Sequence, residues 1–264
     1  MTLLANLTWP EAARLAAEGA LLAVPVGSTE QHGPHLPLST DTDIATALAG
    51  RLAALRPGVV IAPPVNYGSS GEHAGFAGTL SIGQAALELL LTELGRSATE
   101  TFGHLVFVCA HGGNAVPARQ AVTRLRAESR AVLLWMPLPR PGPDLPLPDA
   151  HAGRTETGLQ LALTPGRVRP GLAEAGNTAS LSRLMPALRA GGVRAVSANG
   201  VLGDPAGASA AEGARLLDQL AADLAATVAA WYPETPREQA GRRGAPLASE
   251  HEARQHEPSG GERQ

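Results

Sequence analysis

The chain of 264 residues is 44% hydrophobic and only 3% aromatic, and its formal net charge is −3 at pH 7. This length fits one large α/β domain or two small ones, and the charge gives no electrostatic reason to expect nucleic acid or an acidic membrane surface as a partner. All 21 basic residues are arginine, which excludes Schiff-base catalysis and a Walker-type phosphate loop, because both need a lysine amine.

The sequence also favours a protein that stays in the cytoplasm. The N-terminus lacks a basic start followed by a long apolar segment, so we expect no signal peptide. No apolar run approaches the length that a membrane span requires. Cys109 is the only cysteine and lies in an apolar run, so it is expected to pack as a small hydrophobic residue.

The first half of the chain alternates helical patterns with short apolar runs. In chain order, we expect a helix at 10–18, a strand at 21–26, a helix at 42–55, a strand at 59–62, a helix at 84–101, a strand at 105–109, a helix at 117–128 and a strand at 131–135. Such alternation is typical of a mostly parallel sheet with helices on both faces.

The second half is less regular. After a proline-rich loop at 137–148, we expect helices at 178–190 and 208–231, with a late strand at 193–196 between them. The segment 233–264 is charged, polar and poor in large apolar residues, so it is expected to be a disordered tail. The sequence therefore predicts a single domain over residues 1–232.

A polar motif follows the expected strand 21–26 directly. In the stretch Gly27–His35, Glu30 and His32 are two residues apart, so in an extended chain they point to the same side. With Asp41 they could form half of the ligand shell of a divalent metal. The alternative is a loop whose polar side chains face water, with Asp41 capping the next helix.

A second group of polar residues follows the expected strand 105–109. His111 stands just past the carboxyl end of this strand, as Glu30 and His32 stand past the end of another. Ligands of open α/β sheets bind beyond the carboxyl ends of the strands. We therefore expect His111 to lie near Glu30 and His32.

Two further segments carry candidate site residues. The glycine-rich loop 66–79 contains Glu72 and His73, which we interpret as substrate-facing; a solvated loop is the alternative. In the segment 149–158, His151 is expected in a loop and Glu156 on the first turn of a helix. Glu156 could instead only interact favourably with the helix dipole.

Together these segments supply two imidazoles, three carboxylates and one additional histidine. The five candidate ligands are Glu30, His32, Asp41, His111 and Glu156. Five ligands with one shared carboxylate suit two divalent ions, and a nitrogen and oxygen donor set indicates zinc, iron(II) or manganese. His151 would then be free to pass a proton from an attacking water to a leaving nitrogen.

Several motifs resemble those of the creatininase family. They are Gly27–His35 with Asp41, the loop 70–79, the turn His111–Asn114, the segment 149–157 and the loop 200–205. The resemblance extends from about residue 21 to residue 231. It implies a three-layer α/β/α domain, a site for two metal ions, cleavage of C–N bonds and a homo-oligomer.

The resemblance also implies roles for individual residues. Asp41 matches a bridging carboxylate, and His151 matches the catalytic histidine of the family. Glu30 and His111 would hold one ion, and His32 and Glu156 the other. The residues expected to contact the substrate are Ser70, Glu72, His73 and Asn114.

The chain departs from creatininase itself at one important position. Creatininase has a glutamate ligand two residues after the equivalent of His111, where this chain has Gly113. Creatinine is therefore not the expected substrate. Gly158 also stands where many members of the family have serine.

Within the family, the sequence most resembles a peptidase that removes a modified C-terminal dipeptide from a ribosomally made precursor peptide. Arg154 or Arg189 could bind the carboxylate of such a substrate, because arginine offers a planar pair of donors. The alternatives are an amidohydrolase acting on creatinine, a formamidopyrimidine or a lactone-like ring, and a non-catalytic scaffold.

Overall fold

A computed structural model of the chain describes residues 1–137 and 149–233. Within these residues one sheet has the strand order β1-β3-β2-β4-β5, and every neighbouring pair of strands is parallel. The strands are β1 (Thr2–Leu3), β2 (Leu21–Val26), β3 (Val59–Ile61), β4 (His104–Cys109) and β5 (Val132–Trp135). The predicted loop at 137–148 and the predicted tail at 233–264 lie outside the described residues, except for Pro137 and Pro233.

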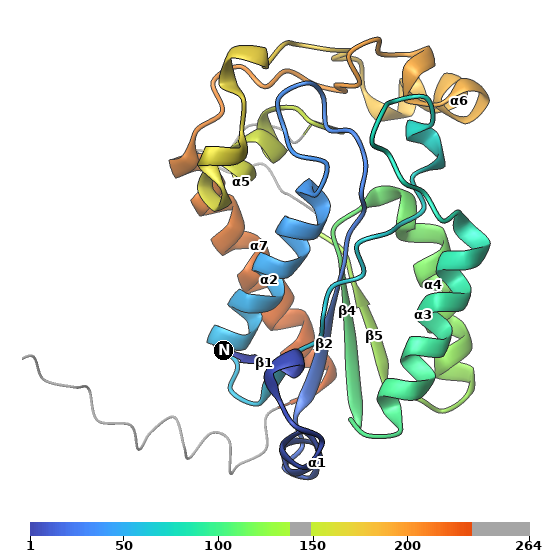
Figure 1. Ribbon diagram of the computed structural model, residues 1–264, viewed down its shortest axis with the longest axis vertical. Helices are drawn as coiled ribbons and strands as arrows, with labels where there is room; N and C mark the ends of the chain where they lie inside the picture. Colours follow the sequence, from blue (N-terminus) through green and yellow to red (C-terminus); the bar gives the residue numbers. More distant parts are fainter. Residues whose placement is uncertain (138–148, 234–264) are drawn as a thin grey trace, which may run out of the picture. The chain divides into compact units, whose positions relative to one another are not determined.

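Helices cover both faces of the sheet, as Figure 1 shows. On one face lie α2 (Thr40–Leu55), α5 (Arg154–Leu163) and α7 (Ala210–Trp231). On the other lie α3 (Gln84–Thr99) and α4 (Ala115–Ala127), and Leu15 and Ala16 of α1 (Trp9–Ala17) pack against the same core from the end of the sheet. The predicted α/β/α architecture of three layers is therefore confirmed.

The apolar strands explain this arrangement. All six residues of β2 are buried, and successive side chains of a strand point to opposite faces. Leu21 and Ala23 accordingly belong to the core under α2 and α7, whereas Leu22 and Val24 belong to the core under α3 and α4. A strand buried on both faces needs the continuous apolar run that the sequence provides.

The helix boundaries differ from the predicted ones by a few residues. The helix after β2 begins at Thr40, with Ser39 at its N-cap position, so the alternative in which Asp41 caps this helix is wrong. Asp41 lies inside the first turn instead. The short strand β1, which pairs with β3 at the edge of the sheet, was not predicted.

The predicted strand at 193–196 is also wrong. Residues Val193–Ala195 form a 3-10 helix directly after α6 (Leu181–Gly191), and Gly192 between them has a φ of +69°. Val193 is buried against Leu184 and Leu202, away from the sheet. The apolar residues of this segment thus serve a small separate core.

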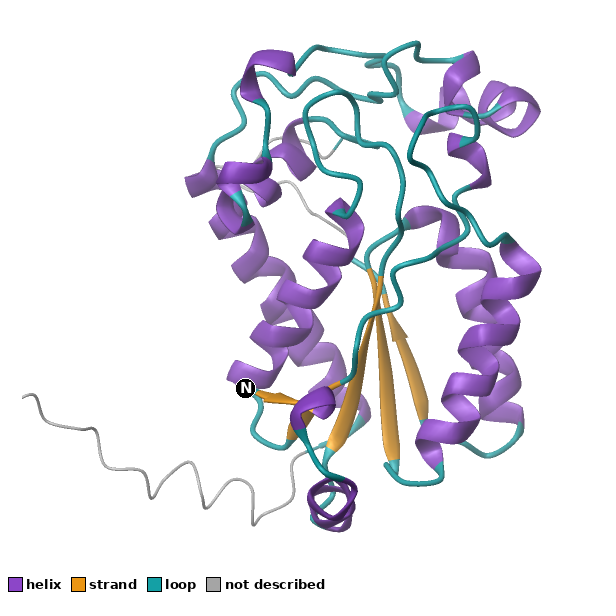
Figure 2. Cartoon of the chain, in the orientation of Figure 1, coloured by secondary structure: helices purple, strands orange, loops and turns teal. Residues whose placement is uncertain are grey.

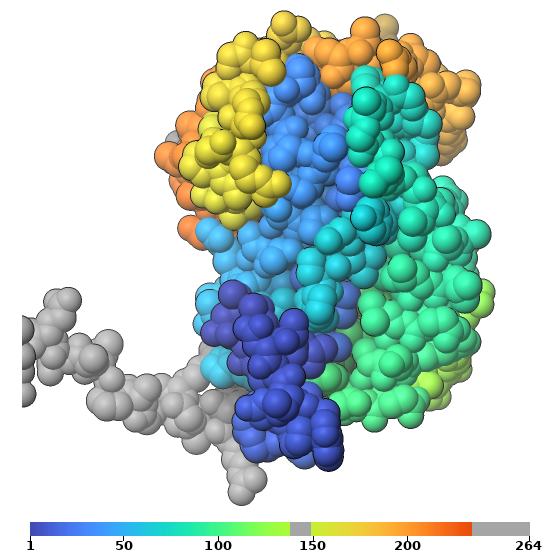
Figure 3. Space-filling view, in the orientation of Figure 1, coloured from blue at the N-terminus to red at the C-terminus, as the bar shows by residue number. Residues whose placement is uncertain are grey.

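The loops at the carboxyl ends of the strands form a thick layer, seen at the top of Figure 2. It includes the 3-10 helices Gly71–His73, Gly112–Asn114, Pro165–Arg167 and Pro170–Leu172, together with α6. In the space-filling view of Figure 3, the segment after β2 lies between the segment after β3 and the segment that includes α5. Segments distant in the sequence therefore meet at this end.

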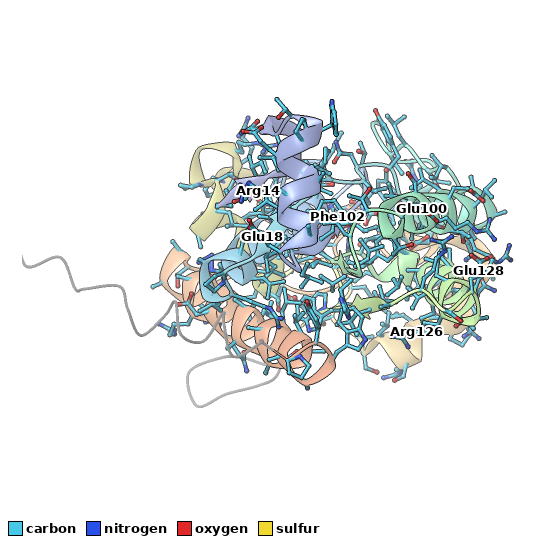
Figure 4. The ribbon with its side chains drawn as sticks, turned by 90° about the horizontal axis from the view of Figure 1, so that it is seen from below. Arg14, Glu18, Glu100, Phe102, Arg126 and Glu128 are labelled. Carbon is cyan, nitrogen blue, oxygen red and sulfur yellow. The ribbon has the colours of Figure 1, made fainter. Side chains whose placement is uncertain are left out.

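The opposite end of the sheet carries ion pairs on the surface. Arg14 and Glu18 form a 2.8 Å pair on α1, and Glu128, beyond α4, pairs with Arg96 of α3; Figure 4 shows this end from below. Exposed pairs of this kind contribute little to stability. Among the described residues, no helix has both the length and the apolar character that a membrane span needs.

Candidate metal centre

The candidate ligands meet at the carboxyl ends of β2 and β4. These strands are neighbours, with Val26 opposite Cys109, so the loops that follow them are adjacent. Glu30 Oε2, after β2, lies 3.1 Å from His111 Nε2, after β4. The structure therefore brings together two residues that are 81 positions apart in the sequence (111 − 30).

Asp41 reaches the same place from the first turn of α2. The loop after β2 passes so close to α2 that a Cβ atom on Gly27 would lie 2.5 Å from Thr42 N, which only glycine avoids. Ser28 Oγ donates a 2.7 Å hydrogen bond to Asp41 Oδ2. Asp41 then lies between two histidines, with Oδ1 3.4 Å from His32 Nε2 and Oδ2 3.2 Å from His111 Nδ1.

Glu156 comes from the first turn of α5, as predicted. The side chain of Asp149 accepts hydrogen bonds from the free N–H groups of Arg154 and Thr155 at the start of this helix. Ala152, whose φ of +53° is unusual for a residue other than glycine, donates its N–H to Glu156 Oε2 at 2.6 Å. The loop before α5 thus fixes this carboxylate.

The ligand atoms fall into overlapping sets of three, and the atoms of each set lie within 4.8 Å of one another. One set contains Glu30, Asp41 and His111, and another contains His32, Asp41 and Glu156. A carboxylate shared by two sets is the arrangement that a pair of metal ions needs. A third set joins Glu30 and His32 to His151.

The hydrogen bonds leave suitable atoms free to bind cations. His32 Nδ1 lies 3.2 Å from the carbonyl oxygen of Glu30, and His111 Nε2 lies 3.1 Å from that of Ser69. A carbonyl only accepts, so each of these nitrogens carries the proton and the other nitrogen of each ring is available, as is usual for metal-binding histidines.

Several buried atoms that make no hydrogen bond also indicate that this cluster binds cations. Both carboxylate oxygens of Glu30 and Nε2 of His32 are buried and make no hydrogen bond among the described residues. Such atoms are costly unless a partner compensates them. The two overlapping sets therefore fit divalent metal ions that bind nitrogen and oxygen.

The charges of the cluster are strongly coupled. Burial alone would lower the pKa of His32, but Asp41, Glu156 and Glu30 outweigh it and raise this pKa to about 10. The pKa of His111 is likewise raised to about 10, against the effect of burial, by Glu30 and Asp41. In the metal-free protein, protonated histidines thus balance the carboxylates.

The pKa values of the two glutamates shift upward, whereas the pKa of Asp41 shifts downward. Burial raises the pKa of Glu30 and that of Glu156 to about 7. Burial also acts to raise the pKa of Asp41, but His32 and His111 outweigh it and hold this pKa well below its usual range. Asp41 is therefore ionised in the metal-free protein at neutral pH.

These pKa values predict that metal binding releases protons. His32 and His111, with pKa values near 10, are protonated at pH 7 and must each lose a proton to bind a cation. Zinc affinity should therefore increase with pH, and below pH 7 protonation of Glu30 and Glu156 should weaken it further.

Calorimetric titration with zinc in buffers of different ionisation enthalpy measures the number of protons released. We expect more than one proton per zinc ion at pH 7. A binding enthalpy that does not depend on the buffer would contradict this prediction.

His151 lies beside the two ligand sets that share Asp41. Its Nδ1 is 4.0 Å from Glu30 Oε1 and 4.0 Å from Glu156 Oε2. Burial, followed by the nearby imidazoles of His32 and His73, lowers the pKa of His151 well below its usual range. His151 is therefore neutral at pH 7, so one of its two ring nitrogens carries no proton.

Two of the predicted substrate-binding residues lie next to His111. Ser70 Oγ is 3.5 Å from His111 Nε2, and Glu72 Oε1 is 3.7 Å from the same nitrogen. The Glu72 side chain is partly exposed, so it can contact both the cluster and the solvent. Its carboxylate occupies the space into which a Cβ atom on Gly113 would project. A carboxylate from another loop thus lies beside Gly113, where the sequence itself has no acidic side chain.

The other two predicted substrate-binding residues are engaged within the protein. Asn114 is fully buried; its side chain accepts from Ser69 N at 2.8 Å and donates to Gly27 O at 2.9 Å. Both ends of its amide thus hold loops together. His73 is buried as well and faces Gln31 and Glu30 rather than solvent. Both side chains therefore contact other parts of the protein, and their contact with a substrate stays a prediction.

The two arginines considered for a substrate carboxylate differ in their surroundings. Arg154 Nε and Nη2 pair with the buried carboxylate of Glu212 at 2.9–3.1 Å, so this guanidinium is already engaged. Arg189 lies on α6 and is exposed.

Sequence reasoning missed Ser28, which binds Asp41, and Gln31, which is buried between His73 and His151. Gln31 could have been noticed, since it separates two candidate ligands. In an extended chain, however, it would point away from both of them.

The three-layer α/β/α fold and this cluster of candidate metal ligands are the features of a metal hydrolase, and the chain belongs to the creatininase family. The model of that family, described as "Creatininase: Creatinine amidohydrolase", matches residues 5–228. The resemblance inferred from the sequence is therefore confirmed.

The chain is also similar to individual proteins of known name or structure. The chain is 50% identical over 219 residues to the "Mycofactocin precursor peptide peptidase" of Mycolicibacterium smegmatis, covering 81% of this chain and 86% of that protein. A crystal structure of creatinine amidohydrolase is 27% identical, with a TM-score of 0.76 over 89% of this chain and 99% of that one. A mutant creatininase described as "Zn-Zn type" is 26% identical, with a TM-score of 0.76 over 88% and 98% of the two chains.

Proposed function

We propose that this chain is a metal-dependent peptidase that removes the modified C-terminal dipeptide from the mycofactocin precursor peptide. The observation that carries the proposal is the pair of ligand sets that share Asp41. The 50% identity to a mycofactocin precursor peptide peptidase supports the choice of substrate. The presence of the complete cluster argues against a non-catalytic scaffold.

Two divalent ions per chain, zinc, iron(II) or manganese, fit the donor atoms. Glu30, Asp41 and His111 would hold one ion, and His32, Asp41 and Glu156 the other. When bound, such ions polarise a carbonyl and lower the pKa of water.

The other residues would position the substrate and move a proton. His151, kept neutral by burial, would accept a proton from the attacking water and give it to the leaving nitrogen of the peptide bond. Ser70 and Glu72, beside His111, are the proposed contacts for the substrate. Glu72 has the more exposed side chain of the two.

Hydrolysis of the precursor peptide tests this function directly. The metal-free protein, reloaded with zinc, iron(II) or manganese, is incubated with the modified and the unmodified precursor, and the products are identified by mass spectrometry. We expect loss of the modified C-terminal dipeptide only after metal is added, and slower cleavage of the unmodified peptide.

Creatinine serves as the competing substrate in the same experiment. Opening of the creatinine ring without cleavage of the peptide would contradict the proposed substrate and favour a small-ring amidohydrolase. The cytoplasmic location and the homo-oligomeric state remain predictions. Light scattering of the purified protein measures its oligomeric state.

A further inference from the structure

Gln31 lies between the two histidines that border the ligand sets. It is 5% exposed, and its side-chain nitrogen Nε2 lies 2.8 Å from His73 Nδ1 and 3.0 Å from His151 Nε2. Its backbone oxygen lies 2.8 Å from His151 Nε2. One residue thus contacts both rings, although His151 is 120 positions further along the chain.

The orientation of the Gln31 amide is fixed by two backbone groups. Gly33 N–H donates to Gln31 Oε1 at 2.8 Å, and Gln31 Nε2 donates to Gly200 O at 3.1 Å. A flipped amide would place two donors together at Gly33 and two acceptors together at Gly200. Gln31 Nε2 is therefore a donor toward the histidines as well.

This orientation decides which nitrogen of His73 carries the proton. Gln31 Nε2 only donates, so His73 Nδ1 must accept, and the ring proton of neutral His73 lies on Nε2. That nitrogen is 3.3 Å from Glu30 Oε1. His73 thus presents an N–H group to a candidate metal ligand.

The backbone carbonyl of Gln31 determines which nitrogen of His151 carries the proton. The carbonyl oxygen of Gln31 only accepts, so the short contact with His151 Nε2 requires a proton on that nitrogen. A protonated Nε2 cannot accept from the Gln31 amide, whose second hydrogen is then available for His73. Only Nδ1 of His151, which faces Glu30 and Glu156, can gain and lose a proton.

We propose that Gln31 is a positioning residue that fixes the tautomers of His73 and His151, so that His151 exchanges protons with the reaction through Nδ1. The proposal rests on the function proposed above only for the role of His151 as a proton carrier. The tautomers themselves follow from the hydrogen bonds and can be measured without any substrate.

Nuclear magnetic resonance of the zinc-loaded protein, labelled with ¹⁵N in its histidines, identifies the protonated nitrogen of each ring. Resonances are assigned by comparison with the His73→Asn and His151→Asn variants. We expect protonated Nε2 and unprotonated Nδ1 in both rings. A proton on Nδ1 of either ring overturns the proposal.

The variant Gln31→Glu distinguishes the effect of the Gln31 side chain on His73 from the effect of its backbone carbonyl on His151. A carboxylate cannot donate to His73 Nδ1, so the proton of His73 should move to Nδ1, whereas His151 should keep its proton on Nε2 because the carbonyl of residue 31 remains. The kcat should fall by about 10–100-fold, as for other groups that orient metal-site residues, with a smaller change in KM. An unchanged tautomer of His73 in this variant would contradict the role of the Gln31 side chain.

The matched control is Gln120→Glu on the exposed side of α4, which should alter neither tautomer nor kcat. If Gln31→Glu does not fold, the spectrum of the unaltered protein still decides the proposal. Correct tautomers without any peptide hydrolysis would support the assignment and refute the proposed function alone. Hydrolysis with a proton on Nδ1 of His151 would refute the assignment alone.

Discussion

Replacing Asp41 with alanine should abolish peptide hydrolysis and leave the protein with fewer metal ions per chain. Asp41 is the one residue that belongs both to the set with Glu30 and His111 and to the set with His32 and Glu156. Its two oxygens lie 3.4 Å and 3.2 Å from His32 and His111. Its loss therefore weakens both sites at once, whereas loss of any other ligand leaves one set complete.

Metal content by mass spectrometry and turnover of the modified precursor measure this effect. Asp41→Asn is the conservative variant, because it keeps the shape of the side chain but removes its charge. It should also lose activity, since an amide is a weaker ligand than a carboxylate.

The control for Asp41 is Asp43→Asn, two residues further along the same helix. Asp43 accepts hydrogen bonds from Ser39 and Arg167, on the side of the helix that carries no candidate ligand. This variant should keep its metal and its activity. Two bound ions and normal turnover in Asp41→Ala would refute the bridging role.

Replacing His151 with alanine should slow turnover by about 10²–10⁴-fold, the usual contribution of a general acid–base group, without changing metal content. His151 Nδ1 is 4.0 Å from the nearest oxygens of Glu30 and Glu156, further than Asp41 is from its histidines. In the proposed reaction it moves a proton and does not hold the ions.

Measurements of kcat and of bound metal in the same preparation separate these two roles. His151 also completes a possible third ligand set with Glu30 and His32. If His151→Ala lost as much metal as Asp41→Ala, His151 would be a ligand, and the general acid–base would have to be another residue. His104→Asn, at the other end of β4, is the control and should change neither quantity.

The sequence was sufficient to predict most of the fold, because strands and helices of a layered α/β protein leave strong local patterns. β2 and β4 are buried on both faces and therefore read as continuous apolar runs. The position of Glu30, His32 and His111 near one another also followed, since parallel strands bring their carboxyl ends to the same edge. The residues 193–196 have a similar apolar pattern but pack in a separate core, which no local signal distinguishes.

The candidate site could be predicted as a set of residue types but not as a set of contacts. The resemblance to a family suggested which residues act together, and the structure places their ligand atoms within 4.8 Å of one another in two sets. His73 was expected to face substrate because it lies in a glycine-rich loop, and Asn114 was also expected to contact substrate. Both residues are buried, and their polar atoms contact loops that the sequence does not show to be close.

The sequence by itself determined most of the order of strands and helices, the absence of lysine chemistry and the presence of enough histidines and carboxylates for two cations. Only the tertiary structure decided that Asp41 faces two histidines, that Gln31 contacts a ring 120 positions away, and that Glu72 occupies the space beside Gly113. The physical reason is that periodicity reports which side of an element is buried. Hydrogen bonds and shared ligands depend instead on distances between atoms that the chain brings together only when it folds.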